Sequence, residues 1–190
     1  MEQRYDWPLG INVGHACFDR APNGHAVREH LLGRPNEETL EVVPTNMILG
    51  EPVLSGEALQ AQLRIAHSCW IRFAFDFWLF FGVNAMEADG KTGECYWMLF
   101  LNDANPADPN HWLRTASRQE KFDYTLNRIA GFEDKFQEAV KAGGPDAVRD
   151  SFLVYYDGII ESLPVTRVTL LGDAAHPLTP CKLGLSHPSP

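Results

Sequence analysis

The sequence predicts a mixed α+β fold, in which helices pack on a mixed or antiparallel sheet and one last strand joins a different sheet. Three observations predict it. Trp70–Phe81 alternates as a strand does, and Glu94–Leu101 is a second aromatic strand. Two helical segments follow, at Arg118–Ile129 and Glu133–Lys141, before an apolar strand at Arg167–Leu171. Because an apolar sheet face must pack against another layer, we expect the helices to cover it.

Length and composition limit the classes of protein. The chain has 190 residues, 45% hydrophobic and 22% charged, enough for the core of one domain or slightly more. Its formal net charge of −9 argues against binding nucleic acid or an anionic membrane. The first residues do not resemble a signal peptide, and no apolar run is long enough for a transmembrane segment. Four cysteines without CxxC spacing predict reduced thiols, a cytoplasmic location and no metal site.

The first third of the chain predicts two helices and a strand. His25–Leu32 has helical spacing and ends before Gly33 and a proline. Leu40–Leu49 is rich in residues that favour strands, with Pro44 as a defect or edge position. Ser55 is placed to cap a helix that runs from the next residue to about position 67.

The aromatic centre predicts a hairpin. Alternation along Trp70–Phe81 directs one set of side chains to one face: Ile71, Phe73, Phe75, Phe77 and Leu79. Residues 87–93 are rich in turn formers, so this strand should pair antiparallel with Glu94–Leu101. The shared apolar face then has to pack on helices, a ligand or a partner.

The remaining elements follow from local signals. Ser117 and Glu120 form the sequence pattern of a capping box at the start of Arg118–Ile129. Gly131 separates that helix from the next one. We also expect a short strand at Ser151–Tyr156.

One segment is chemically informative, VTRVTLLGDAAHPLTP at Val165–Pro180. A strand ends at Gly172, and Asp173 follows at its carboxyl end, where α/β sheets bind ligands. A carboxylate there can accept hydrogen bonds from sugar hydroxyls. The alternative is that Asp173 caps a helix and His176 lies on the surface. Ser151 and Ser162 lack a GxSxG context, which argues against a hydrolase.

The string GDAAHP after RVTLL closely resembles the second FAD-binding motif of class A flavoprotein monooxygenases, the aromatic-hydroxylase-like family. The resemblance implies that Asp173 binds the ribityl chain of FAD. It implies that the last strand belongs to the FAD-binding domain. It also assigns a set of cofactor-binding residues to this chain: Gly172, Asp173, Ala174, Ala175, His176, Pro177 and Pro180.

An upstream segment supports the resemblance. APNGHAVREHLLG at Ala21–Gly33 is similar to the family's ADGxxSxVRxxLLG, with Asn23 and Ala26 in place of the usual Asp and Ser. The resemblance implies that this segment lies near the FAD pyrophosphate and the path of NADPH or NADH. Arg28 is kept, which implies that it contacts the cofactor or the buried sheet. The alternative for Arg28 is a solvated helix residue.

The sequence departs from the family pattern at two motifs, and both departures bear on whether the chain binds FAD. No GxGxxG occurs, and the family's P-x-x-G-x-G-x-N does not continue after Pro180. The chain therefore resembles a truncated fungal-type member with two parts: residues 1–164, a partial FAD- and substrate-binding domain, and residues 165–190, a remnant of the FAD-binding domain. We expect FAD binding to be weak or absent in the isolated chain. We also expect exposed apolar surface that makes the chain dimerise, aggregate or need a partner, and genomic flanks that encode the missing motifs.

Four aromatic residues are candidates for the lining of a substrate pocket, with core packing as the alternative: Phe75, Phe77, Tyr96 and Trp97. The predicted function is that of an FAD-dependent monooxygenase that hydroxylates or epoxidises a small apolar or aromatic compound in fungal secondary metabolism. No residue is assigned as a catalytic acid or base. Two alternatives stay open: a pseudoenzyme or binding module without flavin, and a truncated gene model.

Overall fold

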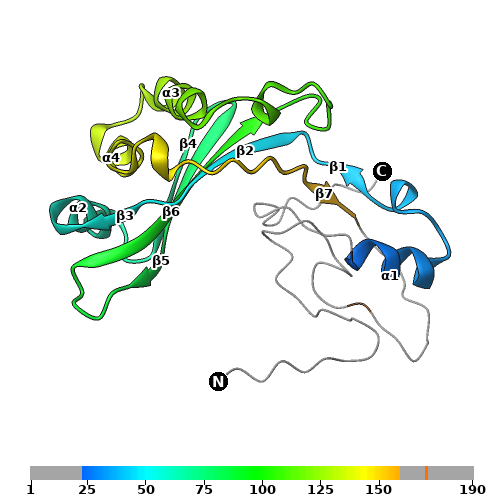
Figure 1. Ribbon diagram of the computed structural model, residues 1–190, viewed down its shortest axis with the longest axis horizontal. Helices are drawn as coiled ribbons and strands as arrows, with labels where there is room; N and C mark the ends of the chain where they lie inside the picture. Colours follow the sequence, from blue (N-terminus) through cyan, green and yellow to red (C-terminus); the bar gives the residue numbers. More distant parts are fainter. Residues whose placement is uncertain (1–22, 159–169, 171–190) are drawn as a thin grey trace. The chain divides into compact units, whose positions relative to one another are not determined.

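The computed structural model describes residues 23–158 and Leu170, and the chain divides into two compact units (Figure 1). One unit is Pro44–Val154. The described part of the other comprises residues 23–43 and 155–158 together with Leu170. The boundary predicted between residues 164 and 165 lies outside the described residues and stays a prediction.

A five-stranded antiparallel sheet forms the centre of the unit Pro44–Val154. Its strands are β2 (Thr45–Gly50), β3 (Val53–Ser55), β4 (Cys69–Phe73), β5 (Phe77–Met86) and β6 (Thr92–Asn102). The order is β2-β6-β5-β4, and β3 pairs with the start of β6 on the same side as β2. The predicted α+β fold with an antiparallel sheet is confirmed.

The prediction of one long strand over Trp70–Phe81 is wrong. The segment is a hairpin, in which β4 pairs with β5 around a turn at residues 74–76. The Ala74 N–H donates to the Phe77 carbonyl at 2.9 Å, and Asp76 forms an ion pair with Arg128 at 2.7 Å. The turn carries no Gly, Pro or Asn, and Asp76 is its single turn-forming residue, so the alternating pattern by itself predicts one continuous strand.

The turn also changes which side chains share a face. Residues directly opposite each other in an antiparallel pair point to the same face. Phe73 lies opposite Trp78, and Ile71 opposite Phe80, so these two β4 residues face away from Phe77. The predicted pairing of the second half of the segment is confirmed, because residues 77–81 pair with Trp97–Leu101.

Three helices cover one face of the sheet: α2 (Gly56–Ile65), α3 (Arg118–Ile129) and α4 (Asp134–Gly143) (Figure 1). The core lies between them and that face. Its sheet side is Ile48, Trp70, Leu79, Phe81, Trp97, Leu99 and Leu101, and its helix side includes Leu59, Phe122, Ile129, Phe132 and Val140. Burying each large apolar side chain contributes about 1.5–3 kcal/mol, so this layer dominates the stability of the unit.

Local signals place the start of α3 and the end of the first helix as predicted, whereas Ser55 precedes α2 without a capping hydrogen bond from its side chain. The Ser117 hydroxyl accepts from the Glu120 N–H, and the Glu120 carboxylate accepts from the Ser117 N–H at 2.8 Å, so the capping box at α3 is confirmed. In the other unit, α1 (Asn23–Leu32) ends at Gly33, whose φ of +63° favours glycine. The short 3₁₀ turns η1 (Asn36–Glu38), η2 (Trp112–Arg114) and η3 (Pro145–Ala147) complete the helical elements.

The strand predicted over Leu40–Leu49 divides at Pro44. Before the proline, β1 (Glu41–Val42) pairs antiparallel with β7 (Tyr156–Asp157), and β2 begins directly after it in the larger sheet. Proline lacks the N–H that a continuous ladder would need. The strand expected at Ser151–Tyr156 is only the short β7, and Arg167–Leu171 falls outside the described range except for Leu170.

Among residues 23–158 and Leu170, no helix has both the length and the apolar character needed to cross a bilayer.

Candidate functional site

The proposed cofactor motif cannot be placed in the fold. Gly172, Asp173, Ala174, Ala175, His176, Pro177 and Pro180 all lie outside the described residues, so their role rests on the sequence. The candidate site that the structure does describe is the sheet face opposite the helices.

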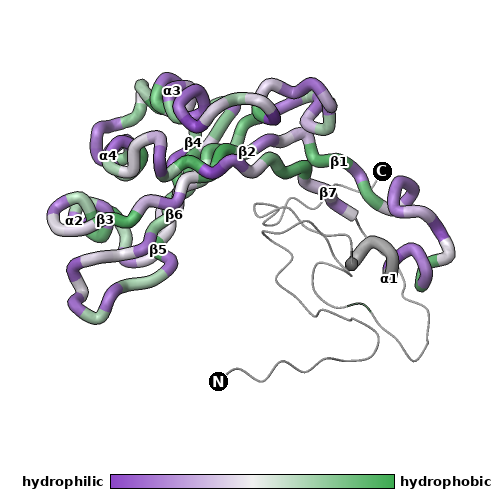
Figure 2. Tube along the Cα trace, in the orientation of Figure 1, coloured by the Kyte–Doolittle hydropathy of each residue, from purple (hydrophilic) through white to green (hydrophobic). Residues whose placement is uncertain are grey.

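Apolar and aromatic side chains from three strands meet on that face. We call it the aromatic face and define it by Ile71, Phe73, Trp78, Phe80, Tyr96 and Met98. None of these six belongs to the core on the helix side. Ile71 and Phe73 are 40% and 61% exposed, and the other four are half-buried. In Figure 2 the middle of the sheet strands is largely apolar, whereas the helices alternate between hydrophilic and hydrophobic positions.

Ring contacts connect the strands across this face. Phe73 contacts Trp78 with ring centroids 6.2 Å apart, and Trp78 stacks on the buried Phe100 at 3.7 Å. Phe80 stacks on Tyr96 at 5.5 Å. Offset and stacked pairs of this kind each contribute about 0.5–1.5 kcal/mol beyond area burial. The face is therefore an ordered set of flat rings.

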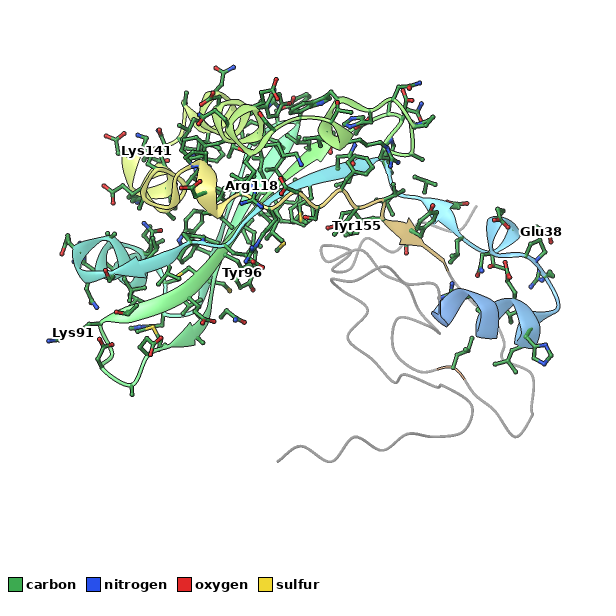
Figure 3. The ribbon with its side chains drawn as sticks, viewed as in Figure 1. Glu38, Lys91, Tyr96, Arg118, Lys141 and Tyr155 are labelled. Carbon is green, nitrogen blue, oxygen red and sulfur yellow. The ribbon has the colours of Figure 1, made fainter. Side chains whose placement is uncertain are left out.

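Tyr96 supplies the hydroxyl group of the aromatic face (Figure 3). Its ring lies over Gly82 on β5, where a Cβ atom would approach the Tyr96 Cζ to 2.6 Å. Burial of the phenol raises the pKa of Tyr96, and the nearby Cys69 adds to the increase. The hydroxyl therefore stays neutral around pH 7 and can both donate and accept hydrogen bonds.

The structure does not bring the four predicted pocket residues together. Tyr96 lies on the aromatic face, but its neighbour Trp97 points to the helix side and is 0% exposed in the core. Phe77 is on the helix side too, stacked on Phe132 at 5.4 Å. Phe75 projects from the β4–β5 turn and is fully exposed.

Sequence reasoning did not propose Trp78 and Phe80, which lie on the same face as Tyr96. Alternation separates both from Phe77 and Leu79, but only the packing of the helices shows which of the two sets lies on the uncovered face.

Arg28 is buried in α1, with 3% of its surface exposed, so the alternative of a solvated arginine is wrong. Its Nη1 donates to Asn36 Oδ1 at 3.2 Å, and the Asn36 N–H donates to Glu29 Oε1 at 3.0 Å. Burial lowers the pKa of Arg28, although a guanidinium still remains charged at any physiological pH. A fixed, buried cation of this kind suits a phosphate group, and whether it contacts a cofactor remains a prediction.

A polar cluster that the sequence did not predict joins β2 to the segment after β6. His111 Nδ1 accepts from the Leu113 N–H at 3.2 Å, so Nε2 carries the proton and donates to Asp103 Oδ2 at 2.7 Å. The buried Asn46 also donates to Asp103. Asp103 has a lowered pKa: burial alone would raise it, but hydrogen bonds from the Asn105 N–H, Asn46 and His111 outweigh that effect. The cluster anchors the segment rather than opening a site.

In the described part of the chain one free cysteine is buried, one is exposed, and no candidate metal site is found. Cys95 is buried, and burial raises its pKa to about 11, so it is an inert thiol. Cys69 is a free, exposed thiol on the edge strand β4. Across residues 23–158 and Leu170, no group of three or more His, Cys, Asp or Glu side chains could hold a metal ion.

Comparison with known proteins identifies the family of this chain. No family model matches the sequence. A curated protein described as an FAD-dependent monooxygenase is 36% identical to this chain over 156 residues, which is 81% of the chain. The chain therefore belongs to the FAD-dependent monooxygenase family. The relative is "FAD-dependent monooxygenase thnD" of Trichoderma harzianum, and the match spans 38% of its length.

Proposed function

We propose that this chain provides the substrate-facing sheet and part of the flavin site of an FAD-dependent monooxygenase. The proposed reaction is hydroxylation or epoxidation of a small apolar or aromatic compound. The observation that carries the substrate class is the aromatic face, an ordered set of rings with one neutral phenol. Because the match spans 38% of the relative's length, the activity is proposed for the longer architecture.

The chain's chemistry fits FAD at two places. The proposed role of Asp173 is to accept hydrogen bonds from the ribityl hydroxyls, with Gly172 and Pro177 forming the adjoining turn. Arg28 fits the pyrophosphate, because a buried guanidinium forms strong charge-assisted bonds to phosphate oxygens. Bound FAD would supply the activation of molecular oxygen, and NADPH or NADH would be the reductant.

The proposed role of the aromatic face is to bind and orient a flat substrate. Trp78 and Phe80 present ring faces on which such a compound can stack, and stacking excludes water from one side of it. The Tyr96 hydroxyl can hydrogen-bond a phenol or carbonyl oxygen of the substrate, which fixes its rotation on the face. The proposed place of this reaction is fungal secondary metabolism.

Flavin binding tests the cofactor part of the proposal. We expect the purified chain to bind FAD weakly or not at all, as measured by quenching of flavin fluorescence during a titration. In a longer protein that restores the missing motifs, Asp173→Ala should lower the affinity for FAD. Asp89→Ala is the matched control, since Asp89 also precedes a glycine but lies in the β5–β6 turn. Equal affinities for both variants would contradict the role of Asp173.

Binding of naphthol, measured by quenching of tryptophan fluorescence, tests the substrate part. We expect Phe80→Ala to lower the affinity for naphthol at least fivefold, because it removes one stacking ring. Val53→Ala, at an exposed position on β3, should leave the affinity unchanged. Naphthol binding by a longer protein that contains this chain but binds no FAD would instead support a ligand-binding module without flavin. A longer protein that binds neither compound would contradict both proposals.

A further inference from the structure

The two edges of the five-stranded sheet differ in whether other backbone segments pair with them. At the β2 edge, residues 147–149 run alongside: the Glu51 N–H donates to Ala147 O at 2.8 Å and the Arg149 N–H to Leu49 O at 2.9 Å. Gly50 also bridges to Val148. At the other edge, β4 is the last strand in the order, and no described strand pairs with its outer side.

The hydrogen-bond register shows which β4 groups point outward. The Ala74 N–H donates to Phe77 O and the Val83 N–H to Ser68 O, so the even-numbered residues 68–74 bond to β5. Bonded positions alternate along an antiparallel strand. The backbone N–H and C=O groups of Cys69, Ile71 and Phe73 therefore point away from the sheet, and all three residues are exposed.

This edge lacks the features that usually prevent pairing with another chain. Edge strands are normally protected by proline, by bulges or by charged side chains. The sequence of β4 is CWIRF, with Arg72 as its single charge, and its pairing with β5 has no bulge. Arg72 is itself ion-paired with Glu133 at 3.4 Å on the helix side.

We infer that β4 is a dimerisation edge, on which a second copy of this chain pairs antiparallel about a two-fold axis at Ile71. Ile71 then lies opposite Ile71 of the second copy, and Cys69 lies opposite Phe73. Each outward N–H meets an outward carbonyl, because these three positions are the bonding ones in both copies. The Phe73 carbonyl already accepts from Arg72 Nη1 at 3.2 Å, but its second lone pair is available.

Charge and side-chain pattern favour a second copy as the occupant. The chain carries a net charge of −9, so two copies repel each other wherever carboxylates meet. The edge β4 has no acidic residue, and Asp76 in the adjoining turn is neutralised by Arg128. The pairing also joins the two aromatic faces side by side, which covers the exposed Ile71 and Phe73. The inference stands independently of the proposed enzymatic function.

The mass of the full chain in solution, measured by sedimentation over a range of concentrations, tests the dimer. We expect a monomer–dimer equilibrium that Ile71→Lys weakens at least tenfold, because two like charges then lie opposite each other. Val53→Lys is the matched control: Val53 is an exposed residue on β3, at the other edge. It should leave the equilibrium unchanged, and circular dichroism should show both variants folded.

A cysteine cross-link tests the register. In a bonded antiparallel pair the Cα atoms lie about 5.5 Å apart, within the range that a disulfide spans. Phe73→Cys should therefore form a covalent dimer with native Cys69 of the other copy under mild oxidation, and peptide mapping should identify that linkage. Val53→Cys should not form it. A monomer at every concentration, a dimer that Ile71→Lys does not weaken, or equal cross-linking of both cysteine variants would overturn the inference.

Discussion

The two faces of the same sheet differ in what surrounds their aromatic residues. On β6, Tyr96 and Trp97 are neighbours in sequence, and each ring lies over a glycine of an adjacent strand, Gly82 and Gly50 respectively. Trp97 is sealed by the helices and is 0% exposed, whereas Tyr96 is half-buried. Aromatic content therefore does not separate core from candidate site. For these two neighbours the helix layer does, because it excludes water from the Trp97 side of the strand.

The largest expected difference between the faces concerns truncation of an aliphatic side chain. Leu99→Ala removes a fully buried residue of the helix side, and we expect it to destabilise the unit by about 3–4 kcal/mol through lost burial and a cavity. Ile71→Ala, at a partly exposed position on the aromatic face, should cost about 1 kcal/mol or less. Urea unfolding measures both. Similar losses would mean that the two faces are equally packed.

Substituting Gly50 or Gly82 by alanine tests the same contrast, because the added Cβ atom would overlap an aromatic ring. A Cβ at Gly50 would overlap the enclosed Trp97 ring, so Gly50→Ala should cost about 3 kcal/mol. At Gly82 the overlapping ring is that of Tyr96, which can shift toward solvent, so Gly82→Ala should cost about 1 kcal/mol. The midpoint of thermal unfolding compares them. A larger loss at Gly82 would contradict the assignment of the enclosed face.

The polar cluster at the end of the helix-side face should make stability depend on pH. Asp103 has a pKa below its ordinary value of 3.8 in the folded chain, so its contribution is complete above about pH 5. As the pH falls through that folded pKa, the contribution is lost, because the unfolded chain binds the proton more readily.

Asp103→Asn should therefore cost about 1–2 kcal/mol at pH 7 and reduce the loss of stability between pH 5 and pH 3. Denaturant unfolding at several pH values measures it. Asp123→Asn, on the solvent side of α3, provides the control. If Asp103→Asn lost as much stability between pH 5 and pH 3 as the unaltered chain, the stabilising role of the Asp103 carboxylate would be contradicted.

The smallest expected effect on stability is that of Tyr96→Phe. The ring remains over Gly82, so we expect a change within about 0.5 kcal/mol in unfolding. The affinity for naphthol should fall roughly fivefold, because one hydrogen bond of about 1 kcal/mol is lost. Fluorescence titration measures the affinity. Loss of stability without loss of affinity would make Tyr96 a packing residue.

Elements that depend on local signals were predictable. The capping box at Ser117 needs only residues within one helical turn, and α3 begins where the sequence indicates. The end of α1 at Gly33 likewise depends only on neighbouring residues. The Asn46–Asp103–His111 cluster was not predictable, because it joins β2 to a segment more than fifty residues later and follows no spacing rule.

The sequence by itself determined the family and the fold class. The string GDAAHP resembles a flavin motif whatever its surroundings, and the relative confirms an FAD-dependent monooxygenase family. Only the tertiary structure decided which aromatic residues lie on which face. The physical reason is that side chains in a strand alternate with a period of two. The turn at residues 74–76 therefore reverses the face assigned to each side chain that precedes it. Which face the helices then cover depends on contacts that no local pattern encodes.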